Sequence, residues 1–275
     1  MKRFVFSFIL ISLFFTTIDA QKYHDLVIKS ADFIEQNKLD SAEVTLKRAM
    51  ALDPANADNA ALLISLGVVQ RQLGKLNDAY ISFSAALNGF PDSKIVLHNR
   101  ASLLYEMNRP KEAMDDYNEI IRQDPANVQA YYRKGLLYLD EKNRAEAERV
   151  FAKAWQLEPS NFYSLLSKAL IFKLDNNWEE AAKIYDKLIE TEKENLSKLY
   201  LSRAECMIHT GKMSLAAADL QSAEKGERDN PYFYFLRGQV RLSQMDKLAA
   251  KGDFEQALSL GYDAPTIKEW IKKAL

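Results

Sequence analysis

Alanine recurs at a nearly constant interval through most of the chain, and this spacing limits the possible folds more than any other feature of the sequence. Intervals of 34 to 37 residues separate seven alanines: Ala42, Ala79, Ala113, Ala147, Ala181, Ala216 and Ala250. A fixed period of roughly 20–50 residues indicates a stack of similar units, each packing on its neighbours. We therefore expect an array of repeats rather than one central core.

Prolines mark the ends of the same units. Four of them are 37, 34 and 34 residues apart: Pro54, Pro91, Pro125 and Pro159. Proline just past a helix ends it, because proline cannot continue the hydrogen-bond ladder. With each proline at position 32 of a 34-residue unit, and the alanines extending the frame, the predicted repeats are 23–56, 60–93, 94–127, 128–161, 162–195, 197–230 and 231–264.

Equivalent positions of these repeats share their chemical character. Position 8 is always Ser, Gly or Ala, position 20 is always Ala, and position 24 is always large and apolar or aromatic. Small residues let two helices approach closely, and large ones fill the space beside them. Positions 4, 8 and 11 share one face of a first helix, and positions 20, 24 and 27 share one face of a second. Turns are expected near position 15, at Gly74, Asn108, Asn176 and Gly211.

These columns resemble the tetratricopeptide repeat. The fourth unit matches best, through Tyr131, Gly135, Tyr138, Ala147, Phe151, Ala154 and Pro159. The likeness extends from about Tyr23 to Ala264, although Gln70 and Arg241 depart from the pattern at position 11. It implies an all-α fold, an α-solenoid of about seven helix-turn-helix repeats in a right-handed superhelix, with the first helices lining a concave groove. Residues 265–275 are amphipathic and predict a C-terminal capping helix, because a stack of repeats needs its open end covered.

Residues 1–20 have the order of a secretory signal peptide. Lys2 and Arg3 precede a short apolar run, Phe4 to Phe15, and a more polar exit ends at Ala20. We expect cleavage between Ala20 and Gln21 and a periplasmic or secreted mature protein. The alternative is an uncleaved anchor, although the run is shorter than the roughly 20 residues of a spanning helix.

Charge and composition argue against several classes of function. Thirty-seven basic residues face 38 acidic ones, so nothing favours nucleic-acid binding. His24, His98 and His209 fall in three separate repeats and cannot easily converge. The single cysteine, Cys206, is expected to be a small apolar contact rather than a reactive thiol or a crosslink. We therefore expect no enzyme activity, no cofactor and no metal site.

Position 7 is basic in six repeats, which suggests either an anion-binding strip or internal bridges. Arginine occupies it in three repeats, and those three carry Asp at position 23. Arginine prefers a planar carboxylate partner, so bridges between the two helices of a repeat are favoured. The predicted pairs are Arg100–Asp116, Arg203–Asp219 and Arg237–Asp253.

The resemblance also implies a binding surface, because positions 2, 5, 9, 12 and 13 of first helices face the groove in this family. In the later repeats these positions form an apolar and aromatic stripe: Tyr132, Leu136, Leu139, Tyr163, Leu166, Leu170, Leu201, Tyr232 and Phe235. Six of these side chains are expected to be more exposed than position-4 neighbours such as Leu165: Tyr132, Leu136, Tyr163, Leu166, Leu170 and Phe235. Exposed stripes of this kind usually bind a partner. The alternative is that the C-terminal helix or a second copy of the chain covers the stripe.

The family's clamp for a carboxylate tail is not expected. Asn99 and Arg133 match it, whereas Ile64, Val68 and Gln129 do not. The sequence thus predicts a non-enzymatic scaffold of the cell envelope that binds a peptide or helix of a protein partner. The alternative is a structural assembly subunit that self-associates or joins an envelope complex.

Overall fold

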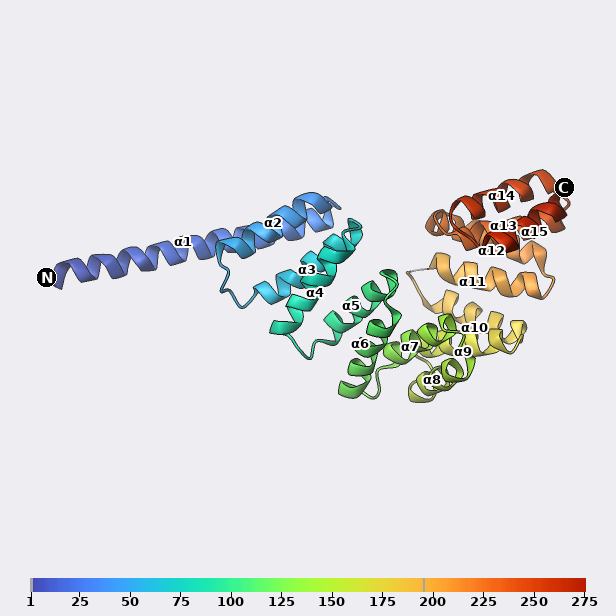
Figure 1. Cartoon of the computed structure of the whole chain (residues 1–275), viewed down its shortest axis with the longest axis horizontal. Coiled ribbons are helices and arrows are strands. Elements are labelled where there is room, and N and C mark those ends of the chain that lie inside the picture. The colour runs from blue at the N-terminus through green and yellow to red at the C-terminus, as the bar shows by residue number, and fades with distance from the viewer. Residues whose placement is uncertain (1, 195) are drawn as a thin grey trace. The chain divides into compact units, whose positions relative to one another are not determined.

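The computed structural model describes the backbone of residues 2–194 and 196–275, and the side chains from Asp19 onward within these ranges. The described chain is built of helices joined by short turns, without a strand (Figure 1). It forms two compact units, one ending at Ala130 and the other beginning at Tyr131, where the sequence predicted one domain. The boundary falls inside helix α7 (Val128–Asp140).

The first unit holds three repeats. Its helices pair consecutively, first helix against second, and the second helices of its first two repeats also pack on the next first helix. The helices are α1 (Lys2–Glu35), α2 (Leu39–Leu52), α3 (Asn59–Gln72), α4 (Leu76–Gly89), α5 (Lys94–Glu106) and α6 (Pro110–Gln123).

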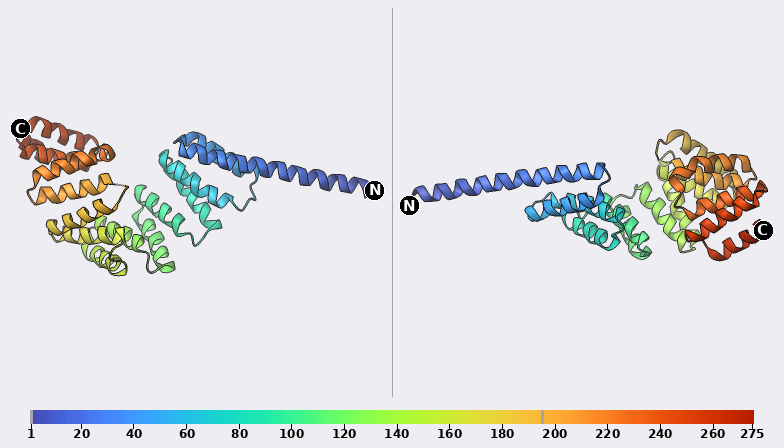
Figure 2. Two further views of the ribbon diagram at one scale, coloured as in Figure 1. Left: turned by 180° about the vertical axis from the view of Figure 1, so that it is seen from behind. Right: turned by 90° about the horizontal axis from the view of Figure 1, so that it is seen from above.

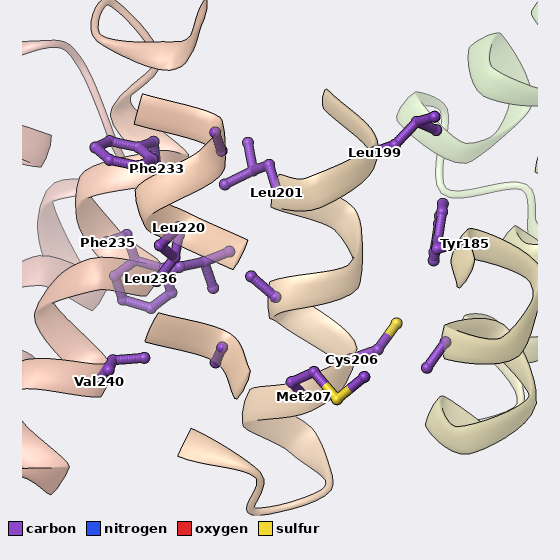
Figure 3. Close-up of a cluster of buried hydrophobic side chains, with 14 of the residues drawn as sticks. Tyr185, Leu199, Leu201, Cys206, Met207, Leu220, Phe233, Phe235, Leu236 and Val240 are labelled. Atoms are coloured by element: carbon purple, nitrogen blue, oxygen red, sulfur yellow. The ribbon is translucent and has the colours of Figure 1, made fainter. Parts of the chain in front are cut away.

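The second unit holds the remaining repeats and the cap. After α7 its helices are α8 (Arg144–Leu157), α9 (Phe162–Leu174), α10 (Trp178–Thr191), α11 (Leu196–His209), α12 (Met213–Glu227), α13 (Pro231–Ser243), α14 (Lys247–Ser259) and α15 (Ala264–Ala274). Figure 3 shows α11 between its neighbours: Leu199 and Cys206 point toward Tyr185 of α10, and Leu201 points the other way. This first helix is thus buried on two sides.

The first helix differs from the prediction. The first predicted repeat starts at residue 23, but α1 begins at Lys2, and its first half extends past α2 in each view (Figures 1 and 2). No proline or glycine lies between Lys2 and Glu35, so nothing in the sequence stops the helix from continuing. The side chains of the expected signal core, residues 4–15, lie outside the described residues, and cleavage after Ala20 stays a prediction.

The turn within each repeat has one fixed geometry. All seven residues at position 15 have a positive φ of 55° to 74°: Asn37, Gly74, Asn108, Lys142, Asn176, Gly211 and Met245. The four predicted turn residues are among them. This left-handed conformation favours Gly and Asn, so Lys142 and Met245 occupy it at a cost.

The predicted core columns are confirmed. All seven alanines of position 20 are fully buried, and the large side chains of position 24 are buried against them. Glycine at position 8 is paired with phenylalanine at position 24 in three repeats. A Cβ atom built on Gly67 would lie 2.7 Å from Cε1 of Phe83, and the same clash arises between Gly135 and Phe151. Ring and backbone are therefore in direct contact.

The two ends of the array have surfaces suited to water. Positions 3 and 10 of later first helices face the preceding second helix and are mostly buried, as Val96 and Leu103 are, whereas the first repeat carries exposed Asp25 and Asp32 there. At the other end, α15 packs on α14 and buries Ile267, as predicted for a cap. Charged or covered ends are what a repeat stack requires.

The three predicted arginine bridges are present and bidentate. Arg203 Nε and Nη2 donate to the two carboxylate oxygens of Asp219 at 2.8 and 2.6 Å, and Arg100 binds Asp116 at 2.9 and 2.6 Å. Arg237 binds Asp253 with Nη2 at 2.8 Å. Arg203 Nη1 also reaches Asp186 of the preceding repeat at 2.7 Å, so this bridge joins two repeats.

Lysine at position 7 follows a different rule, which the sequence reading missed. Lys29, Lys134 and Lys168 each lie over the aromatic ring four residues later, at 5.6 to 5.7 Å from its centroid. Arginine repeats carry no aromatic residue at position 11. The basic column is thus used inside the structure: each arginine binds a carboxylate, each of these lysines lies over a ring, and Arg203 and Arg237 contact rings as well.

Candidate protein-binding face

The nine predicted groove residues all lie on first helices of the second unit: α7, α9, α11 and α13. Seven are half-buried, which leaves part of each side chain accessible. Tyr132 and Tyr163 bring their rings to within 5.5 Å and join α7 to α9. Burial raises the pKa of the Tyr132 phenol, so it stays a neutral aromatic surface. Leu136 and Leu166 are likewise half-buried, and Leu165 is more buried, as expected.

Leu201 and Phe235 do not fit the exposed stripe, and the expectation for them is wrong. Leu201 is 6% exposed and Phe235 is 9% exposed, while Tyr234 at position 4 is half-buried. Tyr262 stacks on Phe235 at 4.7 Å, and Trp270 of α15 meets its ring edge at 5.8 Å (Phe235 is labelled in Figure 3). The C-terminal segment therefore covers this end of the stripe, which was the alternative considered for it.

A charged pair lies between the apolar residues of this face. Lys173 of α9 donates to Glu205 of α11 at 2.5 Å, and both side chains are largely buried. Burial, and to a smaller extent the nearby Glu205 carboxylate, raises the pKa of Tyr232. The same two causes raise the pKa of Tyr262. Lysine and carboxylate thus fix the spacing of two adjacent repeats and neutralise each other.

A ring stack closes the joint between the fifth and sixth repeats. Trp178 and His209 lie parallel, with centroids 3.7 Å apart and planes 3° apart. The linker after α10 is short, and Asn195, the last residue of the predicted fifth repeat, lies outside the described residues. The stack accounts for the position of His209, which occupies groove position 13 of the sixth repeat.

The most exposed apolar side chains at groove positions belong to the first unit, which the stripe prediction omitted. Ile95 at position 2 is 68% exposed and Tyr105 at position 12 is 50% exposed, both on α5. Ile64 and Val68 on α3 are half-buried at groove positions 5 and 9 of the second repeat. The repeat frame assigns these positions to the groove as well, but aromatic residues are denser at the groove positions of the later repeats, and the predicted stripe covers only those repeats.

The single cysteine lies in the core of the second unit. Cys206 is fully buried, and burial raises the pKa of its thiol to about 12. A thiol in such surroundings is a poor nucleophile. Among the residues whose side chains are described, no cluster of three His, Cys, Asp or Glu could hold a metal ion. In that same part of the chain, no helix is both long and apolar enough to cross a bilayer.

Comparison with known proteins agrees with this architecture. Profiles described as "Tetratricopeptide repeat" match residues 98–162 and 163–193. A crystal structure of a tetratricopeptide repeat protein from Parabacteroides merdae is 37% identical, with a TM-score of 0.70, over 92% of this chain and 99% of that one. The chain is a tetratricopeptide repeat protein. Such repeats serve in general as scaffolds for protein–protein interaction.

Parts of this tetratricopeptide repeat chain are similar in sequence to parts of other proteins. Human protein O-mannosyl-transferase TMTC3 is 31% identical over 45% of this chain. The type IV pilus assembly protein PilF of Pseudomonas aeruginosa is 30% identical over 46% of it. The chain spans only 14% of the length of the first relative and 49% of the second.

Proposed function

We propose that this tetratricopeptide repeat protein is a non-enzymatic scaffold that binds a peptide or helix of a protein partner along its groove face. The groove face is defined here as positions 2, 5, 9, 12 and 13 of the first helices. The observation that carries the proposal is its apolar and aromatic surface, exposed at Ile95 and Tyr105 and half-exposed at Tyr132, Tyr163 and Leu166. Aromatic anchors on a rigid scaffold supply most of the energy of peptide recognition.

The non-enzymatic part rests on the chemistry of the site. Among the described residues, the groove face contains two ion pairs, Arg71–Glu106 and Lys173–Glu205, and the two groups of each pair neutralise each other. Cys206 is inaccessible and its thiol pKa is raised. The transferase named among the relatives is matched over 14% of its length, so its activity is not transferred to this chain.

We place the scaffold in the cell envelope or outside the cell. This proposal rests on Lys2 and Arg3 followed by the apolar run of residues 4–15. A mature protein that begins at Gln21 and is recovered from the periplasmic or extracellular fraction supports export with cleavage. An intact N-terminus in the membrane fraction would indicate an anchor instead.

Site-specific photo-crosslinking tests the binding surface directly. A photoreactive phenylalanine analogue would replace Tyr105 or Leu166 on the groove face, and Ile81 on a second helix would be the control. Ile81 is 64% exposed, so it is as accessible as the groove positions. Adducts to a second protein from Tyr105 or Leu166, but not from Ile81, are expected. Adducts from Ile81 alone would exclude the groove face as the binding surface.

An assembly subunit is the second candidate, and the name of the pilus assembly relative favours it. In this role the groove face would contact another copy of the chain or a subunit of a larger complex. The same crosslinks distinguish the two roles. Adducts between two copies of this chain, together with a stable oligomer in solution, would favour assembly over recognition of a separate partner.

A further inference from the structure

A polar track crosses the groove face of the second unit and joins three successive repeats. Lys173 of α9 donates to Glu205 of α11 at 2.5 Å, and the phenol of Tyr232 on α13 hydrogen-bonds the same carboxylate. The three residues occupy groove positions 12, 9 and 2 of their repeats. Glu205 is 9% exposed, so two partners hold this carboxylate inside the protein.

Lys173 has hydrogen-bonding capacity that the protein does not use. An ammonium group carries three N–H donors. One donates to Glu205, and no acceptor for the other two lies among the described residues. The side chain is 18% exposed, and a lysine in this state reaches solvent with its ammonium group. A bound molecule with an oxygen acceptor can therefore replace water at Nζ while the pair with Glu205 stays intact.

Apolar side chains precede Lys173 on the same face of α9. Tyr163, Leu166 and Leu170 lie ten, seven and three residues earlier, which places them on one helix face with this lysine. All three are half-buried. A ligand that lies along this face therefore meets three apolar contacts and then one hydrogen-bond donor.

The groove positions of the second unit are electrically balanced. With histidine counted as neutral, their charged groups are Lys173, Lys198, Asp140 and Glu205, two positive and two negative. A carboxylate bound to Lys173 would compete with Glu205, which would then be buried without its main partner. Separating a buried pair in this way is costly, whereas an uncharged acceptor leaves the pair in place.

The unused donors of Lys173 also distinguish an extended segment from a helix. In the interior of a helix each main-chain carbonyl already accepts a hydrogen bond within the helix. An extended segment leaves its carbonyls unpaired and alternates its side chains, so it presents apolar groups and carbonyl oxygens to one surface.

We propose that the groove face of the second unit binds an extended, uncharged segment of the partner. Its apolar side chains contact Tyr163, Leu166 and Leu170, and one of its main-chain carbonyls accepts from Lys173. This inference rests on the proposed function and narrows it, because it excludes both a helix and a charged tail. Glu205 sets the preference, since it holds the ammonium group in place and cancels its charge.

A displayed library of random dodecapeptides is the probe, because it offers extended, helical, charged and uncharged ligands alike. Peptides retained by the full chain but not by the Tyr163→Ser, Leu166→Ser variant are ligands of this face. They should be enriched in Phe, Tyr, Leu and Ile and depleted in Asp, Glu, Lys and Arg. The affinity of the best peptide should change less than about two-fold between about 50 and 500 mM salt, because no ion pair forms.

The contact with Lys173 is tested with a double variant. Lys173→Met together with Glu205→Gln removes the donor without leaving a charge unpaired. It should weaken the best peptide about ten-fold, the usual effect of one hydrogen bond to a charged group. Lys212→Met with Glu179→Gln is the matched control, because this Lys–Glu pair also joins the fifth and sixth repeats but lies outside the groove positions. The control should leave the affinity unchanged.

Two measurements address the charge and the conformation of the ligand. Glu205→Gln alone leaves the ammonium group of Lys173 uncompensated, so selection on this variant should enrich peptides that contain Asp or Glu. Infrared spectra of the ¹³C-labelled best peptide, bound to the unmodified chain, should show an extended main chain.

Results on the unmodified chain alone can overturn the inference. Enrichment of acidic or basic peptides, an affinity that falls with salt, or a helical bound peptide would each contradict it and leave the proposed function standing. An unchanged affinity in the Lys173 and Glu205 double variant would show that the ammonium group takes no part. Peptides retained equally by the unmodified chain and by the Tyr163 and Leu166 variant would instead count against the groove face as a binding surface.

Discussion

Gly238 and Phe254 are in such close contact that glycine is required between the helices of the seventh repeat. A Cβ atom on Gly238 would lie 2.5 Å from Cε1 of Phe254. The second and fourth repeats show the same pair, and repeats with Ala or Ser at position 8 have Leu or Tyr at position 24. In every repeat, the residue at position 24 thus fits the space that the residue at position 8 leaves.

Gly238→Ala should therefore destabilise the second unit. The added methyl group must displace a fully buried ring, and overpacking costs roughly 1–3 kcal/mol. Thermal or urea unfolding measures this loss. Gly252→Ala is the control in the same repeat, because no atom lies within 4 Å of its Cβ position and residue 252 is exposed within α14. There the change should be neutral or stabilise the helix by up to about 1 kcal/mol. Equal effects of the two variants would contradict the assigned contact.

The bridge between Arg203 and Asp219 should contribute far more than surface ion pairs. Asp219→Asn leaves a mostly buried guanidinium without its main partner, a loss of roughly 3 kcal/mol. Arg122→Gln removes an exposed pair with Glu119 and should change stability by less than about 1 kcal/mol. Urea unfolding of both variants gives the comparison. A loss at Asp219 no larger than that at Arg122 would show that the bridge is incidental.

Glu43 should make the first unit sensitive to acid. Hydrogen bonds from Lys47 and Lys75 lower the pKa of its buried carboxyl from 4.5 to about 2. The folded-state pKa is depressed, so this stabilisation is complete above about pH 4.5 and is lost as the pH falls toward 2. Urea unfolding at pH 6, 4 and 3 should show the decline, on the order of 2 kcal/mol in total.

Glu43→Gln should lower the stability at pH 6 and reduce the acid dependence. Glu119 has a similarly lowered pKa, about 2, but its partner Arg122 is exposed. Glu119→Gln is therefore the matched control and should leave the pH profile nearly unchanged. If the two variants altered the profile equally, the buried position of Glu43 would not be the cause.

Replacing Lys142 by glycine should raise the stability of the second unit, because residue 142 has a turn conformation that suits glycine. Its φ is +58°, and Gly74 and Gly211 occupy the equivalent turns at +73° and +74°. Lys142→Gly removes a steric cost and should stabilise the second unit by about 1 kcal/mol. Gly74→Ala should destabilise the first unit by a similar amount, although nothing lies within 4 Å of its Cβ position. A gain from both substitutions, measured by thermal unfolding, would contradict this reading of the turn.

Much of the fold follows from the sequence because each repeat is decided locally. The four predicted turn residues at position 15 and the four prolines at position 32 all fall between two consecutive helices. The predicted start of the first helix was wrong because no proline or glycine lies between Lys2 and Glu35, so the helix continues through the expected cleavage site. The division at Ala130 was also not predicted, since no proline, glycine or charge run marks it.

The candidate site was predicted less well than the fold. Repeat positions identify which side chains face the groove, but not which neighbours cover them. Burial of Phe235 depends on Tyr262, in the loop that ends the seventh repeat, and on Trp270 of the cap, and the helix positions of the repeat say nothing about either contact. Gln70, a departure at position 11, is explained only in three dimensions, because it accepts from Ser82 at 2.7 Å and donates to Glu43.

Binding by the groove face is the central claim, and quantitative partner capture from the envelope fraction tests it most directly. The variants are Ile95→Ser with Tyr105→Ser and Tyr163→Ser with Leu166→Ser, and the control is Val44→Ser with Ile81→Ser on second helices. Val44 and Ile81 are 59% and 64% exposed, so the control removes a comparable apolar surface. At least one groove variant should lose capture by about ten-fold while helical content and oligomer size stay constant. Full capture by both groove variants, with loss in the Val44 and Ile81 control, would contradict the claim and assign binding to the second helices.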